Sequence, residues 1–368
     1  MHIKLLSLIN FKNYKEVSLE LHPKLNCFVG DNGAGKTNFL DALYYLCMCK
    51  SYFTSTDQYS IYSGEKFMAL QADFIRKNKS EEIYCGLKQN RKKKFRRNKK
   101  EYLKLSDHIG LFPVVMVSPA DIQLILDGSE ERRKYMNSVI SQYNKTYLND
   151  IIHYNKVLAQ RNKFLKDTLR NGSQMDLLDI FDKQLVTLGN EIYRARYQFI
   201  KEFIPVFDRY YSFISENNES VELIYESQLN SGDYSEKLKN SRNKDLVLQY
   251  TTTGIHKDDL VLSLNGNSIK KIGSQGQQKT YLVSLKLAQF EFLKQVNDVL
   301  PVLLLDDVFD KFDPNRVKQM LKLVAADSFG QIFITHTNID RMKDLLGELR
   351  FEHKLFLVTK GAIEEIKN

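Results

Sequence analysis

The strongest constraint on this chain is a glycine-rich loop that follows a short apolar run near the N-terminus. Residues 25–29 are predicted to form a strand, residues 30–37 read Gly-Asp-Asn-Gly-Ala-Gly-Lys-Thr, and residues 39–49 place apolar side chains at helical spacing. Strand, loop and helix stand in the order of the phosphate-binding pattern G-x-x-x-x-G-K-[ST]. The glycines let a polyphosphate approach the backbone N–H groups at a helix N-terminus. An α/β fold with a nucleotide site is therefore predicted.

Each position of the loop has a predicted role. Lys36 is expected to reach the β- and γ-phosphates, and the hydroxyl of Thr37 is expected to bind Mg²⁺. The residues predicted to contact the nucleotide are Gly30, Asp31, Asn32, Gly33, Ala34, Gly35, Lys36, Thr37 and Asn38.

The overall composition is that of a globular protein of 368 residues, long enough for two lobes. No apolar run approaches the roughly 18–20 residues that span a bilayer, so we expect a cytoplasmic protein with no membrane partner. Four cysteines lack the paired spacing of a zinc site and are expected to be reduced, buried thiols. The formal net charge of +9 favours a polyanionic partner, with nucleic acid ahead of an anionic membrane.

Much of the positive charge gathers in one short segment. Residues 88–100 contain nine Lys or Arg and no acid. One interpretation is a solvated hairpin whose charges protect a sheet edge from pairing. The other is a surface that contacts the phosphate backbone of a nucleic acid, which would make binding dependent on salt. Because so many like charges repel one another, we favour the second interpretation, with Lys92, Lys93, Lys94, Arg96 and Arg97 as the candidate DNA-binding residues.

The middle of the chain alternates between strand and helix patterns. Strands are predicted at 67–75, 82–88, 112–117, 221–227 and 260–264, and a polar loop at 231–243. Apolar residues at three- and four-residue steps predict helices from about 136 to 165, and from 177 to 203 with an end near Pro205. We interpret these stripes as the core of a lobe rather than an exposed dimer seam.

The second half of a nucleotide site is predicted in the last third of the chain. Residues 302–305 are an apolar strand that ends in Asp306 and Asp307. Adjacent buried carboxylates repel each other unless a cation lies nearby, so Asp306 is expected to hold Mg²⁺ and Asp307 to orient or deprotonate the attacking water. A further strand, 331–334, leads to His336. This histidine either has a structural role or reaches the γ-phosphate, and its place at a strand end favours the second role.

A second anion-binding helix start is predicted at Ser-Gln-Gly-Gln-Gln-Lys-Thr, residues 274–280. Ser274 is a natural N-cap of the amphipathic helix that follows. Because residues 30–37 already supply one phosphate cradle, this second site indicates a nucleotide held between two subunits. Ser274, Gly276 and Gln277 are the predicted contacts from the other copy.

These motifs together resemble the ABC-type ATPase head of SMC and Rad50 proteins, and most closely the RecF family of bacterial recombination mediators. The residues that carry the RecF resemblance are Asn10-Phe11-Lys12-Asn13-Tyr14, 30–38, Lys50-Ser51-Tyr52-Phe53-Thr54-Ser55, Ser118-Pro119-Ala120-Asp121, Arg132-Arg133, Gly254-Ile255-His256-Lys257-Asp258-Asp259 and 274–280. The resemblance implies an α/β ABC-type head (a P-loop NTPase) with a mixed sheet, antiparallel strands and an inserted helical lobe. We expect lobe I at 1–117 and 300–368, and lobe II, with the signature motif, at 118–299.

The same resemblance implies a function. The chain is expected to bind ATP and Mg²⁺, to dimerise head-to-tail on ATP, and to hydrolyse it slowly in a DNA-dependent way, with hydrolysis resetting the dimer. It is expected to bind single- and double-stranded DNA at gap junctions and to cooperate with RecR and RecO in loading RecA. The Q-loop glutamine is not securely placed, with Gln123 as a candidate. The competing functions are the ATPase subunit of a membrane transporter and a structural SMC-like head.

Overall fold

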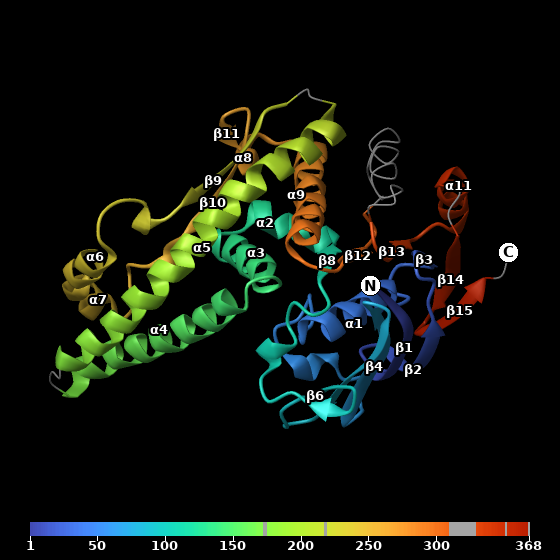
Figure 1. Ribbon diagram of the computed structural model, residues 1–368, viewed down its shortest axis with the longest axis horizontal. Coiled ribbons are helices and arrows are strands. Elements are labelled where there is room, and N and C mark those ends of the chain that lie inside the picture. Colours follow the sequence, from blue (N-terminus) through green and yellow to red (C-terminus); the bar gives the residue numbers. More distant parts are fainter. Residues whose placement is uncertain (172–174, 217–218, 309–328, 350–351, 367–368) are drawn as a thin grey trace. The chain divides into compact units, whose positions relative to one another are not determined.

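The computed structural model describes the whole chain except residues 172–174, 217–218, 309–328, 350–351 and 367–368. The chain forms two compact units. Figure 1 colours the chain by residue number. Unit 1 comprises residues 1–121, 213–216 and 283–368, and unit 2 comprises residues 122–212 and 217–282. The assignment of residues 118–299 to a separate functional lobe stays a prediction.

Unit 1 contains an antiparallel sheet that begins at the N-terminus. Its order is β2-β1-β4-β5-β6-β7, with β1 at His2–Phe11, β2 at Tyr14–Glu20, β4 at Phe67–Arg76, β5 at Lys79–Lys88, β6 at Lys94–Arg97 and β7 at Lys100–Glu101. Along β4 and β5, buried residues alternate with more exposed ones, as expected for strands with one face on the core. The predicted strands at 67–75 and 82–88 are therefore confirmed.

The second sheet of unit 1 is mixed and carries the predicted nucleotide elements. Its order is β15-β14-β3-β13-β12-β8, with β3 at Leu25–Val29, β8 at Val114–Val117, β12 at Val302–Leu305, β13 at Ile332–His336, β14 at His353–Thr359 and β15 at Ala362–Ile366. Only β15 runs antiparallel to its neighbour. Every residue of β3, β8, β12 and β13 is buried, which explains their near-continuous apolar sequences. Because β14, β3, β13, β12 and β8 are parallel, their carboxyl ends meet at one edge.

Helix α1 (Lys36–Met48) contacts strands of both sheets, with β1, β4 and β5 in one and β8 and β13 in the other. Eleven of its thirteen residues are buried. A helix that is enclosed on all sides must be apolar nearly all round, and this one is. Its buried acid, Asp41, forms an ion pair with Lys12, the two atoms Nζ and Oδ2 being 2.6 Å apart. Burial of α1 between the sheets fixes the position of the loop that precedes it.

Unit 1 has further short elements. They are α11 (Ile339–Leu349) and the 3₁₀ helices η1 (Asp57–Ser60), η2 (Leu105–Asp107) and η3 (Pro119–Ile122), the last of which ends at the start of unit 2. The four cysteines are free and buried, as predicted. Among the described residues, no helix is both long and apolar enough to cross a membrane.

Unit 2 combines helices with a small sheet of order β11-β10-β9. Its elements are α2 (Gln123–Leu126), α3 (Ser129–Ser141), α4 (Lys145–Asn171), α5 (Met175–Ser215, whose last three residues belong to unit 1), β9 (Val221–Glu226), η4 (Gln228–Asn230), α6 (Tyr234–Asn240), α7 (Arg242–Leu248), η5 (Ile255–Lys257), β10 (Asp259–Leu264), β11 (Asn267–Ser268) and α8 (Ile269–Ile272). Helix α9 (Gln275–Val296) begins in unit 2 and continues in unit 1.

The two long helices α4 and α5 lie side by side (Figure 1). Arg161 of α4 is fully buried and donates from Nε to Asp182 of α5 over 2.7 Å. The predicted apolar stripes face this interior, since Met136, Tyr154 and Val157 are at most 1% exposed. Most of the stripe residues are therefore core, as we interpreted them, although Ile152 is 54% exposed.

Three expectations about unit 2 were wrong in detail. Helix α5 does not end near Pro205 but continues to Ser215, because Phe207 and Tyr211 beyond the proline pack in the core and offset the lost backbone hydrogen bond. The segment 231–243 is not a loop throughout: Asp233 caps α6 by accepting from the N–H of Glu236. The helical pattern from 136 to 165 is broken after α3, where Asn144 Oδ1 accepts from Tyr147 N–H and starts α4.

His108, a buried histidine of unit 1, is expected to make stability depend on pH. His108 Nε2 lies 2.7 Å from the carbonyl oxygen of Leu46 and so carries the hydrogen, while Nδ1 lies 3.1 Å from the Tyr102 hydroxyl. Burial lowers the pKa of His108 from 6.5 to about 4. The unfolded chain therefore takes up this proton at a higher pH than the folded chain, and we expect a loss of up to about 3 kcal/mol as pH falls from 6.5 to 4.

Urea unfolding at several pH values measures this loss. The variant His108→Gln should lower the slope of unfolding free energy against pH, whereas His153→Gln, at an exposed position of α4, should leave the slope unchanged. Equal slopes for the wild type and His108→Gln would contradict the assignment.

Candidate functional site

The glycine-rich loop joins β3 to α1 at the carboxyl edge of the mixed sheet. The ammonium group of Lys36 turns back into the loop, where it donates to the carbonyl oxygens of Gly30 over 2.7 Å and Asp31 over 3.1 Å. Lys36 is only 4% exposed, so its charge is held inside the loop. The loop thus encloses a cation next to the backbone N–H groups at the start of α1, which is an arrangement that attracts phosphate.

Two glycines of the loop are required by their neighbours. A Cβ on Gly30 would lie 2.2 Å from the carbonyl oxygen of Val358 in β14. A Cβ on Gly35 would lie 2.4 Å from Asn13 Nδ2, and the backbone there has a φ of 125°, which L side chains rarely adopt. A larger residue at Gly30 would displace the backbone of β14, and one at Gly35 would displace the Asn13 and Tyr14 side chains and strain its own backbone.

The turn between β1 and β2 braces the loop from outside. Asn13 Nδ2 donates to the carbonyl oxygen of Ala34 over 3.0 Å, and Asn13 Oδ1 accepts from Asn38 Nδ2 over 2.8 Å. The Tyr14 hydroxyl donates to the carbonyl oxygen of Gly35 over 2.8 Å. Residues 10–14 carry part of the family resemblance in the sequence, and these contacts give them a physical role.

Asp306, the first of the two acids after β12, lies beside the loop. The hydroxyl of Thr37 lies 2.9 Å from each carboxylate oxygen of Asp306. Thr335 donates its hydroxyl hydrogen to Asp306 over 2.9 Å and accepts from the N–H of Asp307 over 2.8 Å. Asp307 has a φ of 45°, a left-handed conformation that aspartate tolerates better than most residues. Thr335 therefore fixes both acids, a role that the sequence did not reveal.

Burial makes Asp306 a suitable partner for a cation. Burial raises its pKa to about 6, against the hydrogen bonds from Thr37 and Thr335, which favour the charged form. A buried carboxylate next to a second one gains most from a nearby positive charge. The oxygens of Thr37 and Asp306 fit Mg²⁺, which accepts few protein ligands and completes its shell with phosphates and water. In the described part of the chain, no group of three or more His, Cys, Asp or Glu side chains could hold a metal by itself.

His336 is the last residue of β13, whose neighbours are β3 and β12. It is 1% exposed, and its Nδ1 accepts from the backbone N–H of Asn338 over 2.8 Å. This bond leaves Nε2 as the protonated nitrogen of the neutral ring. The structure brings His336 to the same sheet edge as Lys36 and Asp307, whereas its contact with a phosphate stays a prediction.

The signature residues lie in unit 2, at the start of α9. Gln277 N–H donates to Ser274 Oγ over 3.2 Å, and Ser274 N–H donates to Gln277 Oε1 over 2.7 Å. This reciprocal pair is a capping box, so the predicted N-cap is confirmed. The carbonyl oxygen of Gly276 accepts a hydrogen bond from Thr280 Oγ, one helical turn later in α9. The contact of Ser274, Gly276 and Gln277 with a partner's nucleotide stays a prediction.

The basic segment, residues 88–100, contains the last residue of β5, all of β6 and the first residue of β7. It lies at one edge of the antiparallel sheet. Two of the five candidate DNA contacts are already paired within the protein: Lys93 Nζ lies 2.8 Å from Asp57 Oδ2, and Arg97 Nε lies 2.8 Å from Glu81 Oε2. The Arg96 guanidinium lies over the ring of Tyr84, 5.5 Å from its centroid. Lys92 and Lys94 are exposed. Lys93 and Arg97 thus hold the hairpin in place, and the exposed charge lies on their neighbours.

Two other segments that carry the RecF resemblance, residues 50–55 and 118–121, contact each other inside unit 1. The Ser51 hydroxyl donates to Asp41 over 2.7 Å, and the Tyr52 hydroxyl donates to Asp121. Lys286 Nζ, on α9, lies 2.9 Å from Asp121 Oδ1. The segments 50–55 and 118–121 therefore hold α1, β8 and α9 together through buried polar contacts.

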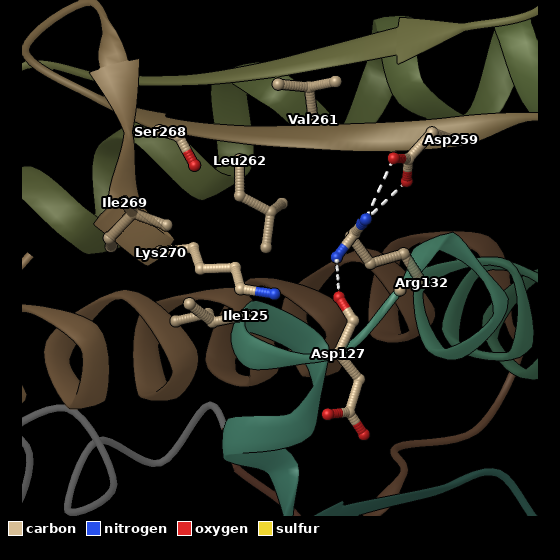
Figure 2. A pocket seen from close by; sticks show the side chains of 10 residues that line it. Ile125, Asp127, Arg132, Asp259, Val261, Leu262, Ser268, Ile269 and Lys270 are labelled. Carbon is tan, nitrogen blue, oxygen red and sulfur yellow. Dashed lines mark hydrogen bonds and ion pairs between the residues drawn. The ribbon is translucent and has the colours of Figure 1, made fainter. Parts of the chain in front are cut away.

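The remaining motifs have structural roles in unit 2. Arg132 binds both carboxylate oxygens of Asp259, at 2.6 and 2.9 Å. Figure 2 shows this pair beside a cavity of about 300 Å³ lined by Ile125, Asp127, Gly128, Arg132, Asp259, Val261, Leu262, Ser268, Ile269 and Lys270. Arg133 donates to the carbonyl oxygen of Asp258, whose carboxylate lies 2.7 Å from buried Arg196. Sequence reasoning missed Arg196, because one arginine within an amphipathic helix gives no signal.

His256 belongs to the same buried network. Its Nδ1 lies 2.9 Å from the Tyr154 hydroxyl, and its Nε2 lies 3.0 Å from the carbonyl oxygen of Thr251. Burial lowers the pKa of His256 to about 4, so the ring is neutral near pH 7. Gln123, the Q-loop candidate, is exposed at the start of α2.

Known proteins share this architecture over its full length. Residues 2–351 match the family described as RecF/RecN/SMC N terminal domain. DNA replication and repair protein RecF of Phocaeicola vulgatus is 48% identical over 369 residues, which cover 100% of this chain and 99% of the relative. RecF of Bacteroides fragilis is 49% identical over 368 residues, with the same coverage.

Solved structures agree with the sequence relatives. A structure of the recombination mediator protein RecF-ATP in the RecFOR pathway has a TM-score of 0.90 at 30% identity, covering 100% of this chain and 98% of the other. An Smc head bound to the C-terminal winged-helix domain of ScpA has a TM-score of 0.60 at 15% identity and shares the fold. The predicted fold class, an ABC-type ATPase head with a mixed sheet and antiparallel strands, is confirmed.

Replacing Asn13 tests whether the β1–β2 turn supports the glycine-rich loop. Asn13→Ala removes two hydrogen bonds to residues 34 and 38, and we expect ATP to bind about tenfold more weakly because the loop loses its fixed shape. Binding is measured by isothermal titration with ATP and Mg²⁺. Glu16→Ala, at an exposed position of β2, is the matched control and should bind as the wild type does. Equal affinity in the two variants would show that the turn does not support the loop.

Proposed function

The chain belongs to the RecF family of DNA replication and repair proteins, and from this premise we propose that it is an ATP-dependent recombination mediator that binds DNA. The observation that carries the proposal is the arrangement at one sheet edge of Lys36 and Thr37 in the loop with Asp306 and Asp307 after β12. These are the parts that an ATPase of this fold uses. ATP, with Mg²⁺, supplies the phosphoryl group to be transferred to water.

Each residue has one proposed task in hydrolysis. Lys36 binds the β- and γ-phosphates, and Thr37 and Asp306 hold the metal. Asp307 orients the attacking water and accepts its proton, and His336 contributes from the neighbouring strand end. The side chain of Asp307 is one methylene shorter than the glutamate usual in ABC transporters, which fits slow turnover. In this proposal, hydrolysis returns the ATP-bound dimer to its starting state and does not drive transport.

We propose that the complete site needs two copies of the chain. Ser274, Gly276 and Gln277 of one copy would contact the nucleotide bound by the other, giving a head-to-tail homodimer that depends on ATP. The capping box at the start of α9 supports this role, because it orders a helix N-terminus that is suited to an anion. DNA-dependent ATP turnover would couple dimer closure to DNA.

The proposed substrate is DNA at junctions of single and double strands, with RecR, RecO and RecA as partners in the cytoplasm. Support comes from the solved relatives, which are described as recombination mediators in the RecFOR pathway. The excess of 54 basic over 45 acidic residues suits a polyanionic partner.

Measurements of ATP turnover and of sedimentation test whether ATP controls dimerisation and whether DNA stimulates hydrolysis. We expect gapped DNA to stimulate hydrolysis more than intact duplex does, and Asp307→Asn to lower turnover at least about a hundredfold, because the water loses its base. Asp307→Asn should also accumulate as an ATP-bound dimer, whereas Lys36→Ala should stay monomeric because it cannot hold the phosphates. An Asp307→Asn variant that remains monomeric with saturating ATP would rule out the two-copy site.

The basic hairpin makes a separate prediction. Replacing the exposed Lys92 and Lys94 by Gln should weaken duplex binding and flatten the dependence of log K on log salt by about 0.9 for each phosphate that is no longer neutralised. Fluorescence anisotropy at several salt concentrations measures both quantities. Lys79→Gln, an exposed lysine at the opposite end of β5, is the control. Unchanged affinity and slope in the double variant would remove the hairpin from the DNA interface.

A further inference from the structure

Residues 274–277, which we call the signature turn, are linked by side-chain hydrogen bonds to a buried cluster of aromatic residues in unit 2. Gln277 uses its carbonyl oxygen for Ser274 N–H and donates its Nε2 to Glu219 Oε1 over 2.7 Å. The other carboxylate oxygen of Glu219 accepts from the Tyr211 hydroxyl. Tyr211 is fully buried in α5. A continuous row of hydrogen bonds therefore runs from the core of unit 2 to the start of α9.

The buried end of this row is rigid. The ring of Tyr211 packs against Tyr281 of α9, with centroids 5.8 Å apart, and Phe207 packs against the same ring at 4.9 Å. Tyr281 in turn donates its hydroxyl hydrogen to the carbonyl oxygen of Glu222 in β9 over 2.8 Å. Glu219 is thus held by a side chain that cannot easily move.

The carboxylate of Glu219 decides which way the Gln277 amide faces. A carboxylate only accepts hydrogen bonds, so the NH₂ end of the amide must turn to Glu219 and the oxygen must turn to Ser274 N–H. That orientation closes the capping box. Ser274 Oγ then accepts from Gln277 N–H over 3.2 Å, and the exposed hydroxyl keeps its hydrogen for an anion in front of the helix.

We propose that Glu219 is a positioning residue for the signature turn, holding Gln277 so that Ser274 presents its hydroxyl to the phosphate of a partner-bound nucleotide. This inference rests on the proposed two-copy site. Glu219 itself touches no reacting atom, and an anion so close to an arriving phosphate is tolerable because both its oxygens are engaged by donors.

The experiment compares Glu219→Ala, Glu219→Gln and Glu222→Gln in the full chain. Ala removes the link, and we expect about tenfold less ATP-dependent dimer in sedimentation at a fixed ATP concentration. Gln can still accept from Gln277 and donate to Tyr211, so it should restore most of the dimer. Glu222→Gln alters an exposed side chain of β9, spares the backbone oxygen that binds Tyr281, and should match the wild type.

Two further measurements separate positioning from a general loss of structure. The ATP affinity of the monomer, measured by isothermal titration, should be the same in all variants, because the proposed role of Glu219 concerns only the nucleotide bound by the other copy. Hydrogen exchange of the Gln277 amide, which donates to Ser274 Oγ, should be faster in Glu219→Ala alone.

The outcomes distinguish the two proposals. A wild type that does not dimerise with ATP overturns the two-copy site and this inference with it. A wild type that dimerises while Glu219→Ala dimerises equally well, with unchanged exchange at Gln277, overturns the role of Glu219 alone. Weak dimerisation in both Ala and Gln variants would assign the effect to charge and likewise reject positioning.

Discussion

The hydrogen bonds between Thr37 and Asp306 join two segments that are 269 residues apart in sequence. They exist because β3 and β12 are parallel strands of one sheet, so that the loop after the first and the acids after the second reach the same edge. Isolated carboxylates at the end of a buried apolar strand would be costly. The neighbouring hydroxyls of Thr37 and Thr335 lower that cost, and the fold around them has to keep these groups together.

The two sheets of unit 1 serve this arrangement through α1. A helix buried between them cannot shift without disturbing both, and its first residues are the last of the phosphate loop. The β1–β2 turn adds a second restraint through Asn13 and Tyr14, and β14 adds a third through the close approach of Val358 to Gly30. The loop is thus shaped by three neighbours as well as by its own glycines.

Sequence patterns predicted the parts of the molecule whose chemistry is local. Apolar runs located β3 and β12, the loop pattern located Lys36 and Thr37, and the N-cap preference of serine located Ser274 at the start of α9. Patterns failed where distant packing decided the outcome. Pro205 lies inside α5 because aromatic residues beyond it are buried, and the ion pairs of Lys93 and Arg97 depend on acids far from them in sequence. The sequence alone does not distinguish the basic residues of this segment from one another. The fold shows which of them form ion pairs within the protein.

The order of strands in the mixed sheet has a consequence for synthesis of the chain. Strand β3 is complete at Val29, yet both its neighbours, β13 and β14, lie within residues 332–359. Until nearly all of the chain has left the ribosome, β3 has neither of its partners, and the loop lacks Asp306, His336 and the backbone of Val358. A truncated product would therefore carry the whole glycine-rich loop without a formed nucleotide pocket. Translation must all but finish before this site can form.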